Sequence, residues 1–221
     1  MWYNQAAMKL LAIDRSTDVQ SVAFSDGGRT VDCIFAGTDA RSAEWPVKVR
    51  DFLAGHGCGF CDLDRIVVGV GPGSFAGIRA ALSFAQGLAI GMRAQRGGDA
   101  SNPVVYGMPS AMAMTGETGL TAVVGDARRG LFWVAVYDGA KVVSELHLVS
   151  EAELPAAVPP DASVVTPDAV RIGGRLETIF GERFAGGHSP SAVRMAEIAL
   201  SHPEMLKAEP LPVYLSPAVR V

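Results

Sequence analysis

The chain has 221 residues, of which 49% are hydrophobic and 19% charged, so it is a folded globular chain with room for one or two domains. Its formal net charge of −4 argues against a protein that binds nucleic acid without a partner chain. Such proteins usually carry a stripe of basic residues, and only small basic pairs such as Arg128–Arg129 occur here. The N-terminus lacks the features of a secretory signal and no apolar run is long enough to cross a bilayer, so we expect a cytoplasmic protein without a membrane span.

The three cysteines do not form a disulfide framework, because their number is odd and Cys33 lies far from the other two. Cys58 and Cys61 have the Cys-x-x-Cys spacing of redox pairs, but such a pair opens a helix, whereas this one is expected in a loop before a strand. A zinc site would need a second pair of ligands, and none is suitably spaced. We therefore expect reduced loop cysteines, with a redox or metal role as the alternative.

The first part of the chain predicts three strands followed by an amphipathic helix. The strands are expected at Leu10–Asp14, Val19–Ser25 and Arg29–Phe35, with a hairpin turn at Asp26-Gly27. The helix is expected at about Ser42–Gly55, because its apolar residues recur at helical spacing. Its apolar face consists of Trp45, Val49, Phe52 and His56.

The stretch from Arg65 to Gly91 is the most distinctive part of the chain. A β-branched run at Ile66–Val70 predicts a buried strand, and after a glycine-rich turn Ser74 stands at a helix N-cap position. In the helix that follows, Phe75–Ile90, a single residue is charged, and such a helix should be covered on most sides. Two small-residue stripes run along this segment: Gly77, Ala81, Ala85 and Ala89, and Ala80, Ser83, Gly87 and Gly91. We expect it to lie between its own sheet and a second surface, and either stripe could face outward.

The second half of the chain repeats the design of the first. Three strands are expected at Thr121–Gly125, Leu131–Tyr137 and Lys141–Val149, joined by turns at 127–130 and 138–139. The same 112 residues separate Asp14 from Asp126 and Asp26 from Asp138. The remaining expected elements are strands at 104–106 and 163–166, a short helix from Ser110, and helices at 151–157, 171–180 and 192–201.

Each half therefore predicts the order β-β-β-α-β-α. Three antiparallel strands followed by crossover helices give a mixed sheet. We expect a duplicated α/β fold with two lobes, the N-terminal lobe at residues 8–106 and the C-terminal lobe at residues 107–221. The last helix is a candidate to pack back on the first lobe.

The turn from Gly71 to Gly77 matches none of the common catalytic or phosphate-binding loops. A P-loop ends in Gly-Lys-Ser/Thr, which is missing here, and in the dinucleotide fingerprint the third glycine would come one residue before Gly77. A nucleophile elbow needs glycine two residues either side of Ser74, where Pro72 and Ala76 stand. Ser74 is therefore interpreted as a helix cap, and no residue is assigned as catalytic.

The two aspartates that end the first strand of each half form another candidate site. A phosphate-bound metal could be held between the halves by Asp14 and Asp126, and Ser16 follows Asp14 two residues later in the sequence. However, Ala127 follows Asp126 where a glycine would let a backbone approach a phosphate. The alternative, which we favour, is that both aspartates cap turns. The histidines are scattered without a His-x-x-x-His pair, so no metal ligand is assigned and no cofactor is expected.

Several motifs in this order resemble the bacterial TsaB (YeaZ) family. They are Leu11-Ala-Ile-Asp-Arg-Ser-Thr17, Val68-Gly-Val-Gly-Pro-Gly-Ser-Phe-Ala-Gly-Ile-Arg79 with Gln86-Gly-Leu-Ala89, Asp126-Ala-Arg128 and Pro212-Val-Tyr-Leu215. The resemblance runs from about Lys9 to Leu215, and its Gly-Pro-Gly-Ser-Phe motif is highly specific. It implies the duplicated actin-like/Hsp70-like ATPase (ribonuclease H-like) fold, in agreement with the internal repeat.

The resemblance also implies a non-catalytic role in the synthesis of N6-threonylcarbamoyladenosine (t6A), the modified base beside the anticodon of some tRNAs. Members of the family pair with a TsaD-type paralogue that transfers the threonylcarbamoyl group, and a TsaE-type ATPase joins them. The protein alone is expected to form a homodimer and to contact tRNA only indirectly. The interface is expected on the helices at 42–55 and 75–90, at Trp45, Val49, Phe52, Ser74, Phe75, Gly77, Ile78, Ala81 and Ala85. A vestigial nucleotide site with weak residual binding would comprise Asp14, Ser16 and Asp126.

Two alternatives and three departures from the family pattern accompany this resemblance. The alternatives are a small-molecule kinase or ATPase of the same fold that uses Asp14 at a metal site, and a metallopeptidase, against which the missing histidine pair argues. Arg15 stands where threonine is usual, and a large cation there would crowd a phosphate or pair with Asp14. Val70 replaces a commonly polar or basic residue, and Arg41–Pro46 is a variant start of the first helix.

Overall fold

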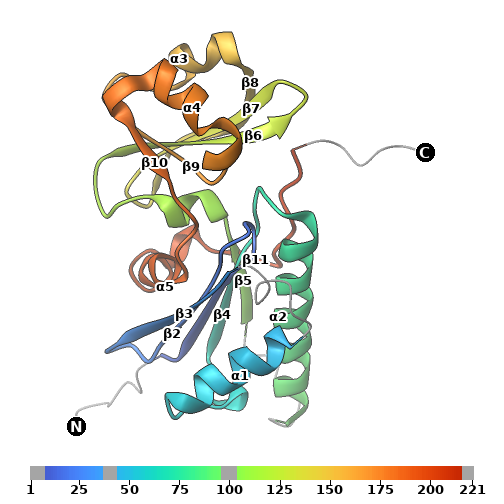
Figure 1. The fold of residues 1–221 in the computed structure, drawn as a ribbon. Coiled ribbons are helices and arrows are strands. Elements are labelled where there is room, and N and C mark those ends of the chain that lie inside the picture. The colour runs from blue at the N-terminus through green and yellow to red at the C-terminus, as the bar shows by residue number, and fades with distance from the viewer. Residues whose placement is uncertain (1–7, 37–43, 96–103, 216–221) are drawn as a thin grey trace, which may run out of the picture. The chain divides into compact units, whose positions relative to one another are not determined.

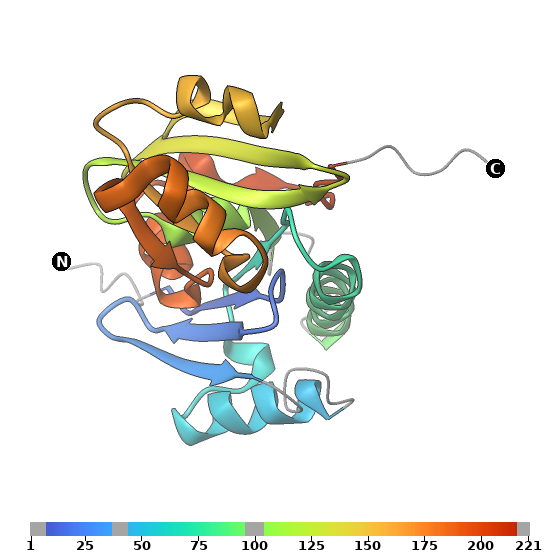
Figure 2. The same cartoon turned by 45° about the horizontal axis from the view of Figure 1, so that its top comes forward.

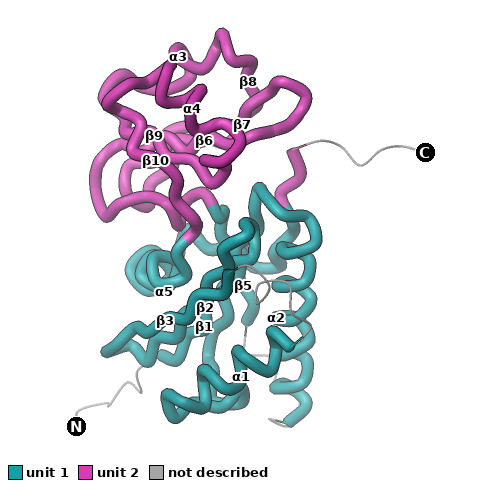
Figure 3. Tube along the Cα trace, in the orientation of Figure 1, with its two compact units in different colours: residues 1–110, 191–212 teal, residues 111–190, 213–221 magenta. Residues whose placement is uncertain are grey.

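The computed structural model describes residues 8–36, 44–95 and 104–215. The chain divides into two compact units (Figure 3). Unit 1 comprises the described residues up to Ser110 together with Ser191–Pro212, and unit 2 comprises Ala111–Pro190 and the described residues from Val213.

Unit 1 is built on a mixed sheet with the strand order β11-β5-β4-β1-β2-β3. Its strands are β1 (Leu10–Asp14), β2 (Gln20–Ser25), β3 (Thr30–Phe35), β4 (Arg65–Gly69), β5 (Val104–Met108) and β11 (Lys207–Ala208). The strands β1, β2 and β3 form the predicted antiparallel meander, and β4 and β5 run parallel to β1. Asp26 closes the β2–β3 turn, because its Oδ1 accepts hydrogen bonds from the backbone N–H groups of Gly28 and Arg29.

Helices cover both faces of this sheet (Figure 1). The helix α5 (Ala192–Ser201) lies on one face, where it packs on β1 and β2, and α1 (Trp45–Gly55) and α2 (Phe75–Gln95) lie on the other. Short 3-10 turns accompany them: η2 (Phe60–Asp62), η3 (Ser110–Met114), which begins at the last residue of this segment of unit 1, and η6 (Pro203–Met205). The predicted start of the first helix at Ser42 lies outside the described residues.

Unit 2 repeats the sheet of unit 1. Its strands are β6 (Leu120–Arg128), β7 (Leu131–Asp138), β8 (Lys141–Ser150), β9 (Ser163–Thr166) and β10 (Phe184–Gly187). Their order β10-β9-β6-β7-β8 is the order β5-β4-β1-β2-β3 of unit 1, with the same parallel and antiparallel pairs. Figure 2 shows β7 and β8 side by side as a long hairpin, in yellow-green to yellow. The predicted duplicated α/β fold with a mixed sheet in each half is therefore confirmed.

The helices of unit 2 complete its core. They are η4 (Glu151–Glu153), α3 (Leu154–Ala157), α4 (Ala169–Phe180) and η5 (Gly181–Arg183). Apolar residues of α4 at helical spacing, such as Ile172 and Leu176, pack with Phe132 and Val134 of β7 in one buried cluster.

Several elements are longer than the sequence predicted, and two strands were missed. The strand β6 continues through Asp126 to Arg128 where a turn was expected, and α2 continues to Gln95, beyond the predicted end at Ile90. The strands β10 and β11 were not predicted.

Candidate functional site

The glycine-rich turn between β4 and α2 is filled by the chain's own β1–β2 loop. The backbone N–H of Ser74 donates to the carbonyl oxygen of Ser16 at 2.7 Å, and a Cβ atom on Gly73 would overlap with that oxygen. A Cβ atom on Gly77 would overlap with the carbonyl oxygen of Arg15. These glycines allow two backbone segments to approach closely, so carbonyl oxygens occupy the helix start at which a phosphate would otherwise accept hydrogen bonds.

Ser74 is the predicted cap of α2. Its Oγ accepts a hydrogen bond from the backbone N–H of Gly77 at 3.2 Å, three residues along the chain. This is the bond by which an N-cap side chain satisfies one of the free N–H groups of the first turn. The cap interpretation of Ser74 is confirmed.

Asp14 lies at the carboxyl end of β1 and is fully buried. Its Oδ1 accepts hydrogen bonds from the backbone N–H of Ser16 at 2.8 Å and from the Ser16 hydroxyl at 2.7 Å. Its Oδ2 has no hydrogen-bond partner among the described residues and lies so close to Gly69 that a Cβ atom there would overlap with it. Burial raises the pKa of Asp14, and the hydroxyl groups of Ser110 and Ser16 oppose this rise. The carboxylate is therefore enclosed by unit 1 and caps the β1–β2 turn.

Arg15 extends toward α1. Its Nε donates to the side-chain oxygen of Gln20, and its guanidinium carbon lies 4.4 Å from the centroid of the Trp45 ring. Partial burial lowers the pKa of this guanidinium, which nevertheless stays charged. Arg15 belongs to the β1–β2 loop that fills the glycine-rich turn, and its contact with Trp45 links this loop to the helix α1.

The nine predicted interface residues divide by burial. Trp45, Val49, Ile78, Ala81 and Ala85 are buried within unit 1. Phe52 and Gly77 are half-buried, and Ser74 and Phe75 are exposed. The buried members form the inner faces of α1 and α2, where Trp45 packs edge-on against Phe84 with ring centroids 4.8 Å apart.

The structure identifies the second small-residue stripe as the outward one. Ala80, Ser83, Gly87 and Gly91 are all exposed, whereas Ala81, Ala85 and Ala89 of the first stripe are buried. Large apolar side chains flank the outward stripe, since Phe75 is 57% and Ile90 is 68% exposed. We call the exposed residues of α2 between Phe75 and Gly91 its outer face: Phe75, Ala76, Arg79, Ala80, Ser83, Gln86, Gly87, Ile90 and Gly91.

A groove of about 410 Å³ lies along part of this outer face. It is lined by Phe60, Cys61, Ser83, Phe84, Gly87, Leu88, Gly91, Met92 and Gln95. Among the described helices, α2 alone is long and apolar enough to cross a bilayer, although 39% of that stretch is buried inside the protein.

The cysteines carry no disulfide. Cys58 is buried, Cys33 is half-buried and Cys61 is exposed. Burial raises the pKa of the Cys33 and Cys58 thiols. Within the described residues, no group of three or more His, Cys, Asp or Glu side chains is arranged to hold a metal ion.

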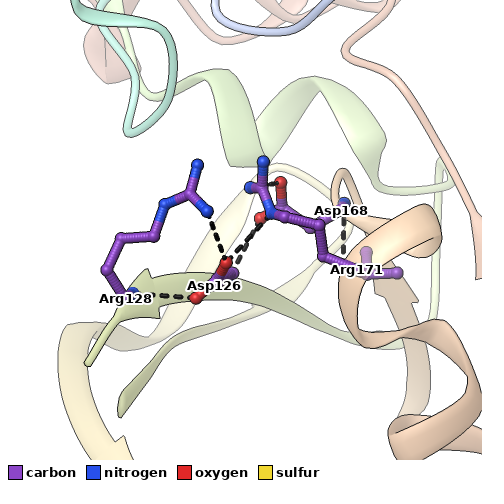
Figure 4. Close-up of polar contacts among 5 residues, drawn as sticks. Asp126, Arg128, Asp168 and Arg171 are labelled. Carbon is purple, nitrogen blue, oxygen red and sulfur yellow. Dashed lines mark hydrogen bonds and ion pairs between the residues drawn. The ribbon is translucent and has the colours of Figure 1, made fainter. Parts of the chain in front are cut away.

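Asp126 of unit 2 lies in a network of ion pairs (Figure 4). Its Oδ2 lies 2.9 Å from Arg171 Nε and 3.3 Å from an Arg128 guanidinium nitrogen, and its Oδ1 accepts from the Arg128 backbone N–H at 2.8 Å. Its own backbone N–H donates to Asp168 Oδ2 at 2.8 Å, and Arg171 also pairs with Asp168. Asp126 therefore caps the β6–β7 turn and is already neutralised by two arginines.

Asp168 and Arg171 were not predicted as members of this cluster. The signal for them is topological, because β9 runs parallel to β6 and ends at Thr166. Residues that follow neighbouring parallel strands meet at the same edge of a sheet, so Asp168 reaches Asp126 and Arg171 follows one helical turn later. Asp14 and Ser16 belong to unit 1, and Asp126 belongs to unit 2.

Parts of the chain are similar in sequence to proteins of tRNA modification. Residues 41–98 match the family model "TsaD: tRNA N6-adenosine threonylcarbamoyltransferase". The tRNA threonylcarbamoyladenosine biosynthesis protein TsaB of Escherichia coli is 33% identical over 138 residues, which cover 59% of this chain and 55% of that protein. TsaB of Haemophilus influenzae is 34% identical over 84 residues, covering 38% and 36%. The matched part thus spans about half or less of the length of these curated relatives.

Two solved structures share the fold. YeaZ from Pseudomonas aeruginosa superposes with a TM-score of 0.73 at 24% identity, covering 94% of this chain and all of that chain. An uncharacterized Pseudomonas aeruginosa protein with similarity to peptidase YEAZ gives a TM-score of 0.76 at 20% identity, covering 95% and all of that chain. These neighbours, with the repeated sheet order, support the predicted two-lobe, actin-like α/β fold.

Proposed function

We propose, from its resemblance to the TsaB (YeaZ) family in sequence and fold, that this chain is a subunit of a TsaD-type complex that makes t6A in tRNA. In this role it supports a TsaD-type transferase without catalysing the transfer itself. A TsaE-type ATPase joins the complex, the chain alone forms a homodimer, and the complex works in the cytoplasm.

The outer face of α2 is the observation that carries this proposal. Between Phe75 and Gly91 the outer face of this helix carries one charged side chain, Arg79, whose guanidinium carbon lies 4.9 Å from the centroid of the Phe75 ring, and a second exposed arginine, Arg93, lies in the last turn. Small side chains at 80, 83, 87 and 91 allow the backbone of a second helix to come close, and the apolar side chains Phe75 and Ile90 would be removed from water. A face of this kind, formed mainly by a segment that matches the TsaD family model, suits a TsaD-type partner.

The surroundings of Asp14 favour the role of a non-catalytic subunit over that of a kinase. A kinase of this fold would need this carboxylate to reach a metal ion on a nucleotide phosphate. Here Asp14 is fully buried and bonded to Ser16, and the backbone of Arg15 and Ser16 fills the neighbouring turn. A nucleotide would have to displace that loop before it could use Asp14.

Co-expression with the TsaD-type protein of the same organism tests the proposal. We expect the two chains to elute together in size-exclusion chromatography, at a larger apparent mass than either alone. With its TsaE-type ATPase and an added activated threonylcarbamoyl donor, the pair should form t6A in tRNA. Isothermal titration of the isolated chain with Mg-ATP serves as the control for the alternative. Separate elution, together with tight Mg-ATP binding that Asp14→Ala removes, would instead support the kinase.

A further inference from the structure

The β6–β7 turn holds two arginines in a backbone conformation that arginine rarely adopts. The φ angles of Arg128 and Arg129 are +68° and +54°, in the left-handed region, and Gly130 follows with +79°. Glycine adopts these angles without the steric cost that a Cβ atom brings. The backbone alone therefore favours glycine at 128 and 129, and the presence of arginine calls for a role of the side chains.

A network of partly buried carboxylates fixes the base of this turn. Asp126 and Asp168 have side chains only 17% and 16% exposed. Asp126 binds the backbone N–H and the guanidinium of Arg128, and Arg171 bridges the two carboxylates. Figure 4 shows the Asp126 carboxylate between the side chains of Arg128 and Arg171. The turn is held rigid before any ligand arrives, which lowers the entropic cost of binding.

The charges of the cluster do not cancel. Two carboxylates pair with two guanidinium groups, those of Arg128 and Arg171, and the adjacent Arg129 adds a third positive charge at the turn, in a chain whose formal net charge is −4. Arg129 is exposed and has no ion-pair partner in the described part of the chain, and the Arg128 side chain is 67% exposed. Their N–H donors are available to an anion from outside the chain, and the guanidinium fork matches the oxygens of a phosphate group.

We propose that the Arg128–Arg129 turn contacts backbone phosphates of the RNA substrate directly, in place of the purely indirect contact that the family resemblance implied; this inference rests on the proposed function in tRNA modification. Two guanidinium groups can reach only a few phosphates, so most of the RNA contact belongs to the other chains of the complex, in agreement with the acidic net charge. The turn contributes affinity and orientation without reading the sequence of the RNA.

The test is the double variant Arg128→Gly/Arg129→Gly, because glycine keeps the left-handed backbone while it removes both side chains. Binding of fluorescently labelled tRNA to the complex with the TsaD-type partner is measured by anisotropy over a series of salt concentrations. We expect the affinity at low salt to fall by up to about fivefold for each guanidinium removed. We also expect the slope of log affinity against log salt to become shallower by about one for each phosphate that the variant no longer binds. The melting temperature should stay the same or rise.

Arg29→Gly is the matched control, since Arg29 is an exposed arginine at the β2–β3 turn of unit 1. It should change neither the affinity nor the slope. A complex that assembles but binds tRNA equally well with the double variant contradicts this inference and leaves the proposed function intact. A wild-type chain that forms no complex contradicts both. Mg-ATP binding that the double variant abolishes, with tRNA binding unchanged, would assign the turn to a nucleotide phosphate and overturn the RNA contact.

Discussion

At the scale of single residues, Asp14 serves the fold by capping the β1–β2 turn from a fully buried position. Its Oδ1 takes two hydrogen bonds from Ser16, its Oδ2 lies against Gly69, and no part of it reaches solvent. The sequence predicted the turn-capping role, because a short polar residue after a strand bonds to the backbone two residues on. Its complete burial could not be predicted, because the residues packed near its carboxylate include Gly69 and Ser110, which are distant in sequence.

The substitution Asp14→Asn should leave the free energy of unfolding at pH 7 unchanged or higher. The amide oxygen can accept both Ser16 hydrogen bonds, and the cost of burying a charge disappears. Asp14→Ala should lower the free energy of unfolding by about 1–3 kcal/mol, because the buried Ser16 donors then have no acceptor. Urea denaturation of the three proteins measures these differences.

The pH dependence of the free energy of unfolding supplies a second test of the burial of Asp14. The pKa of Asp14 is raised in the folded state, so the folded protein binds its proton more tightly than the unfolded protein does. The contribution of Asp14 to the free energy of unfolding should therefore fall as the pH rises from the ordinary aspartate pKa to the raised folded value. Asp14→Asn should lack this fall, and an identical pH profile in both proteins would contradict the enclosed carboxylate.

Two glycines of α2 should respond in opposite directions to alanine. A Cβ atom on Gly77 would overlap with the carbonyl oxygen of Arg15, so Gly77→Ala should lower the free energy of unfolding by about 1–3 kcal/mol. A Cβ atom on Gly87 meets nothing within 4 Å, so Gly87→Ala should raise it by about 0.4–1 kcal/mol. Thermal or urea denaturation measures both, and equal effects would show that the β1–β2 loop does not fill the turn.

At the scale of elements, α2 shows what a sequence pattern can and cannot predict. Its cap, its apolar character and its two small stripes follow from the sequence. Which stripe faces outward does not, because both consist of small residues at four-residue spacing and only packing against β4 and β5 distinguishes them. Several predicted interface residues, including Ala81 and Ala85, pack inside unit 1 instead of lining the outer face.

The strands missed by the sequence analysis are short and lie at sheet edges. The strand β11 has two residues and β10 has four, two of them glycine, and each pairs with a single neighbour. An edge strand of this length has neither a hydrophobic run nor an alternating pattern to reveal it. The central strands β1, β4 and β6 were predicted because burial on both faces gives them continuous apolar runs.

At the scale of the whole molecule, the internal repeat was the strongest predictor of the fold. The constant spacing of 112 residues between Asp14 and Asp126 corresponds to two sheets of identical core order. The two copies have diverged at their turns. In unit 1 the Asp14 carboxylate accepts hydrogen bonds from Ser16, whereas in unit 2 the Asp126 carboxylate forms ion pairs with two arginines. One copy carries the outer face of α2 and the other carries the Arg128–Arg129 turn, so the two proposed contacts belong to different units.

The outer face of α2 as the surface for a TsaD-type partner is the central claim, and a matched pair of arginine substitutions tests it most directly. Gly87 on this face and Gly174 in α4 are both exposed helical glycines whose added Cβ atom would meet nothing within 4 Å, so neither change should unfold the chain. Gly87→Arg should weaken pairing with the co-expressed partner by about 30-fold or more, because it places a charged side chain in the centre of the contact. Gly174→Arg should leave pairing unchanged. If both variants pair with the partner as the wild-type chain does, the outer face of α2 is not the interface.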